Sequence, residues 1–249
     1  MSSGRTAARF SWVVVVFNPD PGKLPVHVAR WLREGLAVRL PGIQVDLRPT
    51  DRAGHGREVA RTAACASLGN PGAAPVLVVA VSGDGGYNDV VNGVMDVPGS
   101  NVVCMVLAGN ANDHHRSVGS LPALEAIVDG PVRLMDLLRL TVTGDRMAPV
   151  VRFAHSYIGF GLTAAMARVI EHAGKGRIRE LTGVARTLPR LRPFEIERAD
   201  DARARFASLV LANVSRMAKY GTVSDSRDPS DGRFEVIGVP TAGRWGPWP

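Results

Sequence analysis

The segment from Val76 to Asp89, with the sequence VLVVAVSGDGGYND, constrains the fold of this chain most. Its first six residues are all apolar and mostly β-branched, which predicts a strand buried on both faces. The strand runs into a glycine-rich turn, and the apolar residues that follow predict a helix beginning near Asn88 and Asp89. Glycines let a phosphate approach the main chain, and the amino end of a helix favours anions. The segment therefore predicts either a phosphate-binding turn or a tight strand-to-helix connection.

Asp84 lies at the tip of this turn, between Gly83 and Gly85. A carboxylate repels a phosphate unless a cation lies between them. If the turn binds phosphate, we therefore expect a nucleotide accompanied by Mg²⁺. In the alternative, structural interpretation, Asp84 only caps the helix.

The order strand, loop, helix recurs along the first half of the chain. Three predicted strands are mostly apolar, the short one at Val45–Arg48 alternates apolar and charged residues, and each ends in a loop of small or polar residues; the strands are Trp12–Phe17, Val45–Arg48, Val76–Val81 and Asn101–Leu107. The helices between them are predicted at about residues 26–39, 58–68 and 89–96. This alternation predicts a doubly wound, Rossmann-like α/β domain with a parallel sheet and ligands at the carboxyl ends of the strands.

The pattern changes near residue 130, where strand-like segments begin to dominate. These segments are Val132–Val142, Val150–Phe160, Ala207–Val214 and Phe234–Val239, and a mostly helical stretch at Thr163–Leu191 interrupts them. We therefore predict a nucleotide-binding α/β domain over residues 1–130. Residues 131–249 are predicted to form a mainly antiparallel β domain with inserted helices.

The formal net charge of +7 favours anionic partners such as nucleotides, anionic lipids or nucleic acid. Residues 168–192 hold seven basic and two acidic side chains, a net charge of +5, which predicts a solvated helix face or contact with an anionic membrane surface. Nucleic acid is disfavoured because the basic residues are not interleaved with aromatic ones. No apolar stretch is long enough to span a membrane, and the two cysteines lack metal spacing. We expect a cytoplasmic protein, peripheral at the inner membrane surface.

Segments along the chain resemble, in order, the motifs of one family. An Asn-Pro turn with Gly-Lys is found at 18–23, and Ser82–Gly93 is similar to a Gly-Gly-Asp-Gly-Thr loop followed by Asn-Glu-Val-x-Asn-Gly. Gly109–Arg116 is similar to a Gly-Thr-x-Asn-Asp-Phe-Ala-Arg loop. Later matches are Asp136, Tyr157–Gly161, and Leu209–Asn213 with Asp231-Gly232. The chain thus resembles the diacylglycerol kinase catalytic domain family, which includes sphingosine kinases and bacterial lipid kinases.

The resemblance implies a kinase that transfers the γ-phosphate of ATP to the hydroxyl of a diacylglycerol-like or sphingoid lipid. It implies that Asp84 is the candidate catalytic residue and also positions the nucleotide or metal. The further nucleotide-binding candidates are Asn18, Lys23 and Thr50, Ser82, Gly83, Gly85 and Gly86, and Gly109, Asn110, Asn112, Asp113 and Arg116. Asp113 and Asp136 are the implied members of a water-bridged Mg²⁺ network.

The chain departs from the family pattern within both loops. Ser82 replaces the first glycine of the central loop, Gly86 replaces its threonine, and Asp89 replaces the glutamate. Asn110 replaces the threonine of the second loop. Ser82 and Gly86 are small, so the cradle can survive, but the loss of both threonines removes two hydroxyls that could bond phosphate or ribose.

The family continues beyond the last residue of this chain and includes an Asp-Gly-Glu segment there, which has no match here. We therefore expect the second domain to lack its C-terminal part. One alternative is a catalytically impaired remnant that binds nucleotide or lipid without reacting. A second is an NAD kinase, because that family shares a Gly-Gly-Asp-Gly loop. Formation of a homodimer stays open.

Overall fold

The computed structural model describes residues 9–19, 24–70, 72–107, 121–161, 164, 193–197, 201, 203–214, 216–217, 221–222 and 228–240. The chain divides into two compact units, Met1–His155 with Val214–Asp231, and Ser156–Asn213 with Gly232–Pro249. The assignment of a nucleotide-binding and a lipid-binding domain on either side of residue 130 stays a prediction.

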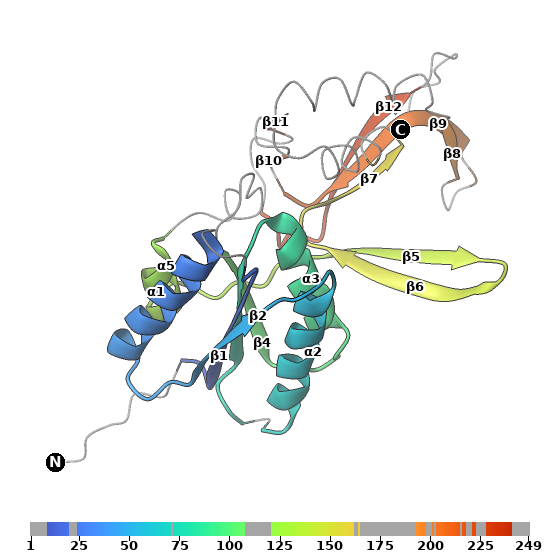
Figure 1. The fold of residues 1–249 in the computed structure, drawn as a ribbon. Coiled ribbons are helices and arrows are strands. Elements are labelled where there is room, and N and C mark those ends of the chain that lie inside the picture. Colours follow the sequence, from blue (N-terminus) through green and yellow to red (C-terminus); the bar gives the residue numbers. More distant parts are fainter. Residues whose placement is uncertain are drawn as a thin grey trace. The chain divides into compact units, whose positions relative to one another are not determined.

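A four-stranded parallel sheet in the order β2-β1-β3-β4 forms the centre of the first unit (Figure 1). The strands are β1 (Trp12–Phe17), β2 (Val45–Pro49), β3 (Val76–Val81) and β4 (Val102–Leu107). Every residue of β3 is buried. Alternate side chains of β1 and β3 enter two separate hydrophobic cores, which is why these strands read as unbroken apolar runs.

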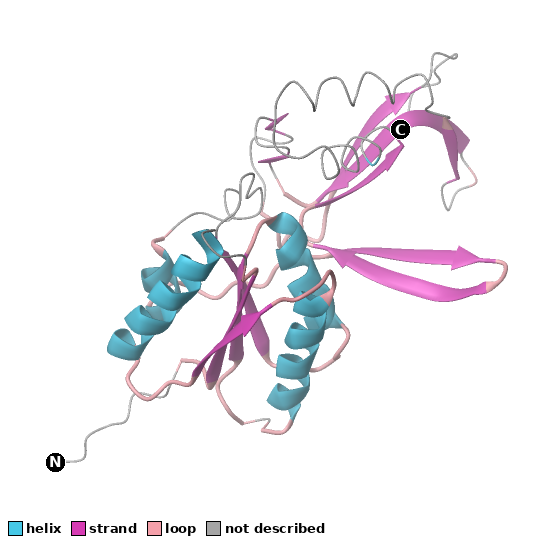
Figure 2. Cartoon of the chain, in the orientation of Figure 1, coloured by secondary structure: helices cyan, strands magenta, loops and turns pink. Residues whose placement is uncertain are grey.

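Helices cover both faces of this sheet (Figure 2). On one face, α1 (Leu24–Arg39) and α5 (Ala123–Val128) pack against the core that contains Val13, Val15 and Val79. On the other face, α2 (His55–Leu68) and α3 (Asp84–Met95) pack against the core that contains Val14 and Val78. The predicted doubly wound α/β architecture is therefore confirmed.

Helices α2 and α3 approach one another closely at Gly93. A β-carbon built at this position would lie 2.2 Å from the carbonyl oxygen of Arg57 and 2.9 Å from the β-carbon of Ala60. The guanidinium of Arg57 also donates two hydrogen bonds to the carboxylate of Asp96, at 2.7 and 2.6 Å, and this ion pair lowers the pKa of Asp96. Glycine at 93 therefore sets the distance between the two helices.

We expect Gly93→Ala to destabilise the first unit. The added methyl group meets a main-chain oxygen, which cannot rotate away, so the helices must separate at a cost of about 2 kcal/mol. Urea denaturation followed by circular dichroism measures this loss. Gly72→Ala is the matched control, because a β-carbon at Gly72 has nothing within 4 Å. Equal stability of both variants would contradict the close approach.

The second unit contains an antiparallel sheet, in which β9 pairs with β7, β8 and β12. The strands are β7 (Tyr157–Gly161), β8 (Phe194–Glu197), β9 (Arg203–Ala212) and β12 (Glu235–Pro240). Phe206, Leu209 and Val210 of β9 are buried. The predicted antiparallel character of the C-terminal part is confirmed. The helices predicted at Thr163–Leu191 lie outside the described residues, apart from Ala164.

The strands β5 (Leu138–Gly144) and β6 (Met147–Ala154) form a separate two-stranded antiparallel sheet, the β5–β6 hairpin. Two short strands, β10 (Arg216–Met217) and β11 (Gly221–Thr222), also pair with one another. The strand predicted at Val150–Phe160 is divided into β6 and β7, because the buried His155 and Ser156 form a bend between them. Among the described residues, no helix is long and apolar enough to cross a membrane.

Candidate active site

The carboxyl ends of β1 and β3 lie side by side at one edge of the parallel sheet. The two strands are neighbours, and their last residues, Phe17 and Val81, are paired. Helix α1 follows β1 on one face of the sheet, whereas α3 follows β3 on the opposite face. In open α/β sheets, ligands bind in the crevice that opens at such a change of direction. Asn18 and Ser82 are the first residues beyond these two strand ends.

The glycine-rich turn is the start of α3. The helix begins at Asp84, five residues before the predicted start at Asp89, and the amide of Tyr87 donates to the carbonyl of Gly83 at 3.1 Å. Gly83 is the N-cap residue, and because it has no side chain it does not cap the first amides of the helix. The first amides of an α-helix have no acceptor within the helix. A β-carbon at Gly85 would meet nothing within 4 Å, so an anion can approach these amides there.

His155 contacts the first turn of α3. Its side chain is buried, and Nε2 lies 3.2 Å from the main-chain oxygen of Asp84. The imidazole packs edge-on against Tyr87, with 4.8 Å between the ring centroids. Burial raises the pKa of the Tyr87 phenol, so it stays neutral at physiological pH. These long-range contacts explain why the helix begins at residues 84–86, where two glycines disfavour it.

Asn92 fixes β6 to α3 by a two-way hydrogen bond. Its Nδ2 donates to the carbonyl of Phe153 at 2.8 Å, and the amide of Phe153 donates to Oδ1 at 2.9 Å. Nδ2 also donates to the carbonyl of Asn88 at 2.8 Å. Asn92 is only 4% exposed. Its side-chain amide bonds both main-chain groups of Phe153, as a residue of a neighbouring strand would. Sequence reasoning noted this asparagine within a motif but gave it no role.

Asp89 lies on α3 where this helix faces the start of α2. A β-carbon built at Gly56, in the first turn of α2, would lie 3.7 Å from the β-carbon of Asp89. Burial raises the pKa of Asp89, and the charge of Arg57, the nearby main chain of Gly54 and the charge of Arg152 only partly oppose this rise. The acidic residue of the motif therefore lies between α3 and the start of α2.

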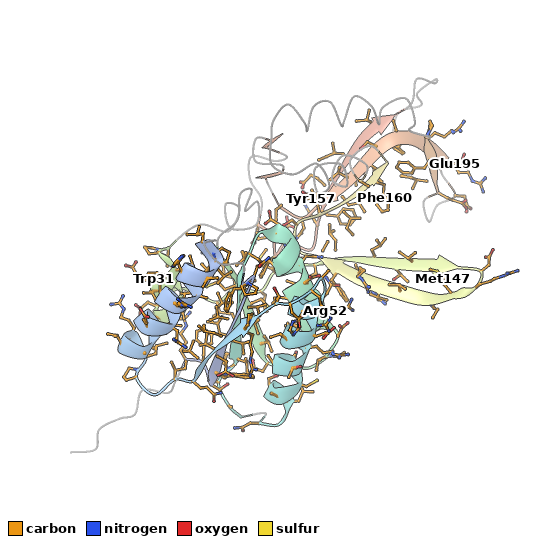
Figure 3. The ribbon with its side chains drawn as sticks, in the orientation of Figure 1. Trp31, Arg52, Met147, Tyr157, Phe160 and Glu195 are labelled. Carbon is orange, nitrogen blue, oxygen red and sulfur yellow. The ribbon has the colours of Figure 1, made fainter. Side chains whose placement is uncertain are left out.

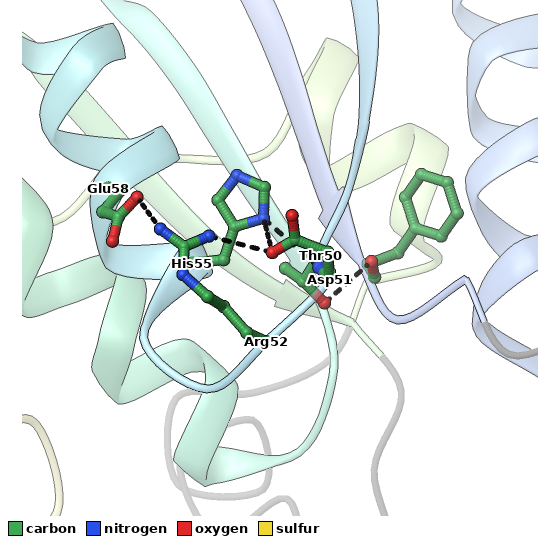
Figure 4. Close-up of polar contacts among 6 residues, drawn as sticks. Thr50, Asp51, Arg52, His55 and Glu58 are labelled. Atoms are coloured by element: carbon green, nitrogen blue, oxygen red, sulfur yellow. Dashed lines mark hydrogen bonds and ion pairs between the residues drawn. The ribbon is translucent and has the colours of Figure 1, made fainter.

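Thr50 is held against the end of β1, next to Asn18. Its amide donates to the carbonyl of Phe17 at 2.9 Å, and its hydroxyl approaches the same oxygen at 3.3 Å (Figure 4). The carboxyl ends of β1, β2 and β3 thus bring Asn18, Thr50 and the glycine-rich turn to the same edge of the sheet.

The loop after Thr50 has an exposed network of charged residues (Figure 4). Arg52 contacts Asp51 at 2.9 Å and Glu58 at 2.5 Å, and Nδ1 of His55 lies 2.7 Å from the Asp51 carboxylate. The hydrogen bond from Arg52 lowers the pKa of Asp51. In this network His55 and Asp51 contact each other, and the ion pairs stabilise the conformation of the loop.

Comparison with known proteins assigns the chain to a family. Residues 12–140 match the model of the diacylglycerol kinase catalytic domain, which is half of the chain. The chain belongs to this family. Over 236 residues it is 22% identical to a diacylglycerol kinase of Bacillus subtilis (strain 168), and the match covers 90% of this chain and 72% of that relative.

Solved structures agree with this assignment at the level of the fold. One from Bacillus anthracis str. Sterne, provisionally described as a diacylglycerol kinase, has a TM-score of 0.66 at 16% identity and covers 94% of this chain and 77% of its own. A second, described as a diacylglycerol kinase of the same strain, has a TM-score of 0.64 at 15% identity and covers 94% and 78%. The diacylglycerol kinase fold therefore extends over nearly the whole chain.

Other positions named by the resemblance to diacylglycerol kinases are only partly described. Lys23, Gly109, Asn110, Asn112, Asp113 and Arg116 lie outside the described residues. Asp136 lies in the segment between α5 and β5, and its amide donates to the carbonyl of Pro229 at 2.8 Å. Ser230 donates its hydroxyl hydrogen to the carbonyl of Leu134, so the turn at residues 228–231 holds this segment.

The described residues contain no ready-made metal cluster, since no three His, Cys, Asp or Glu side chains converge. The donors near the glycine-rich turn instead fit an anion: uncapped main-chain amides and a glycine with open space around it. This arrangement suits a phosphate that brings its own divalent cation, with few protein ligands to the metal.

Proposed function

We propose that this chain is an ATP-dependent lipid kinase that transfers the γ-phosphate to the hydroxyl of a diacylglycerol-like or sphingoid lipid. The observation that carries the proposal is the uncapped glycine-rich start of α3, next to the carboxyl ends of the neighbouring strands β1 and β3, in a chain of the diacylglycerol kinase family. Main-chain amides there would bind the phosphates. Ser82 and the glycines at 83, 85 and 86 would contribute directly, with Asn18 and Thr50 beside the nucleotide.

Phosphoryl transfer depends mainly on positioning and on neutralising charge, plus a group that accepts the proton of the attacking hydroxyl. We assign Asp84 to that proton or to positioning of the nucleotide. Bound Mg²⁺ would neutralise phosphate charge, and Asp113 and Asp136 would hold it through water. Lys23, Gly109, Asn110, Asn112 and Arg116 would complete the nucleotide contacts.

The deciding experiment measures transfer of ³²P from labelled ATP in the presence of Mg²⁺. Three acceptors are offered separately: diacylglycerol in mixed micelles, sphingosine in mixed micelles, and NAD in buffer. Labelled phospholipid or labelled sphingoid phosphate supports the proposal and names the lipid class. Labelled NADP would identify an NAD kinase instead. Binding of ATP with no product from any acceptor would favour a binding protein without catalysis.

We also propose that the enzyme is cytoplasmic and contacts an anionic membrane surface through the β5–β6 hairpin. Val142 and Met147 are 42% and 59% exposed. Met147 lies on the β5–β6 hairpin (Figure 3), and β5 and β6 pair only with each other among the described strands. Residues 138–154 contain three arginines and one aspartate. Exposed apolar side chains beside net positive charge suit an anionic bilayer.

We expect the double variant Val142→Ser, Met147→Ser to bind less to phosphatidylglycerol vesicles, by about threefold or more in a sedimentation assay. The matched control is Val38→Ser, because Val38 is 81% exposed on α1, away from the hairpin. Phosphatidylcholine vesicles test the contribution of charge. Equal vesicle binding by the double variant and the control would exclude the hairpin as the contact, whatever the kinase assay gives.

A further inference from the structure

The loop Ser82–Gly86 departs from the family pattern at its first and last positions, and these two departures are in contact. The family has glycine first and threonine last, whereas this chain has Ser82 and Gly86. A β-carbon built on Gly86 would lie 2.6 Å from Oγ of Ser82 and 2.8 Å from its β-carbon. The side chain of Ser82 therefore fills the space that a side chain at position 86 would need.

This contact sets a steric rule for the loop. Rotation about χ1 moves Oγ of Ser82 but leaves its β-carbon in place, so the separation of 2.8 Å would remain. A β-carbon essentially never lies within 3.0 Å of a heavy atom of a residue that is not its neighbour in the chain. With this backbone, only one of the two positions can hold a side chain. Serine at 82 requires glycine at 86, and a residue such as threonine at 86 requires glycine at 82.

We infer that the two departures compensate for each other: the family's threonine at the last position supplies a hydroxyl to the loop, and in this chain Ser82 supplies that hydroxyl from the first position. The inference rests on the proposed function, because the hydroxyl would then serve the bound phosphates. Oγ of Ser82 lies over the first turn of α3 and donates to the carbonyl of Gly83 at 3.1 Å. A small rotation of the hydroxyl redirects this hydrogen to a phosphate oxygen. Ser82 is thus a positioning residue for the nucleotide.

A double-mutant cycle in thermal unfolding tests the packing exchange without any ligand. It compares wild type, Ser82→Gly, Gly86→Ala and the double variant Ser82→Gly, Gly86→Ala. Gly86→Ala alone is expected to lower the unfolding midpoint by about 5 °C, and most of this loss should disappear when residue 82 is glycine. Alanine is used because the smaller side chain lets the variant fold. An equal loss in both backgrounds would overturn the steric rule.

A second cycle tests the hydroxyl by measuring the affinity for MgATP by calorimetry. Ser82→Ala keeps the β-carbon, removes the hydroxyl and is expected to weaken binding about tenfold, because a hydrogen bond to a charged group is lost. Ser82→Gly should weaken binding similarly. The double variant Ser82→Gly, Gly86→Thr should recover most of the affinity. Unchanged affinity in Ser82→Ala, or no recovery in the double variant, would overturn the hydroxyl's role.

The two cycles separate this inference from the proposed function. A wild-type chain that binds no MgATP would overturn both the kinase proposal and the nucleotide role of Ser82. The unfolding cycle would still decide whether Ser82 and Gly86 exclude each other. If wild type binds MgATP and transfers phosphate but the affinity cycle shows no recovery, only the inference about the hydroxyl fails.

Discussion

Asp84→Asn is expected to reduce lipid phosphorylation by about 10²–10⁴-fold, the usual contribution of a positioned general base. Asparagine has nearly the shape of aspartate and can remain in the first turn of α3, but it has no negative charge and cannot accept the proton. The measurement is ³²P transfer to the preferred lipid at saturating MgATP. The unfolding midpoint of the variant establishes that it folds.

Asp46→Asn is the matched control for this prediction. Asp46 lies on β2, forms an ion pair with Arg48 at 2.9 Å and is not among the candidate site residues. We expect its activity to equal that of wild type. Normal turnover by a folded Asp84→Asn protein would refute the role of Asp84. If Asp84 mainly positions Mg²⁺, higher Mg²⁺ concentrations should restore part of the activity.

Asn92→Leu is expected to give the largest loss of stability, about 3 kcal/mol. Leucine is similar in size but leaves the half-buried amide and carbonyl of Phe153 without their side-chain partner, and each unsatisfied group of this kind costs about 1–3 kcal/mol. Urea denaturation measures the free energy of unfolding. The loss should also reduce kinase activity, because β6 leads directly to His155, which contacts the first turn of α3.

Asn88→Leu is the matched control, one turn earlier on the same helix. The side-chain oxygen of Asn88 accepts no hydrogen bond among the described residues, so its removal takes no acceptor away from a donor there. We expect a change in unfolding free energy below about 1 kcal/mol. If both variants lose the same stability, the two-way bond to Phe153 contributes nothing specific.

The parallel sheet could be predicted because its central strands are buried on both faces. The strands predicted at Trp12–Phe17 and Val76–Val81 have the bounds found in the structure. The family could be predicted from the order of its motifs, and the match over residues 12–140 confirms it. Local pattern suffices where burial alone determines the side chains.

Features that depend on long-range contacts could not be predicted. The start of α3 at Asp84 depends on His155, which is 71 positions away in the chain. The strand predicted over Val132–Val142 begins only at Leu138, because the preceding residues are held by the turn at 228–231. A polar His155 within an apolar run was the available signal, but the sequence does not show what it contacts.

The alternation of β3 between two cores has a consequence for how this chain can evolve. The side chains of Leu77, Val79 and Val81 pack in the core on the α1 face of the sheet, and those of Val78 and Ala80 pack in the core on the opposite face. One inserted or deleted residue would turn the rest of the strand over and send each side chain to the wrong layer. Length changes just before the glycine-rich turn should therefore be tolerated in the connection between α2 and β3 and not within β3.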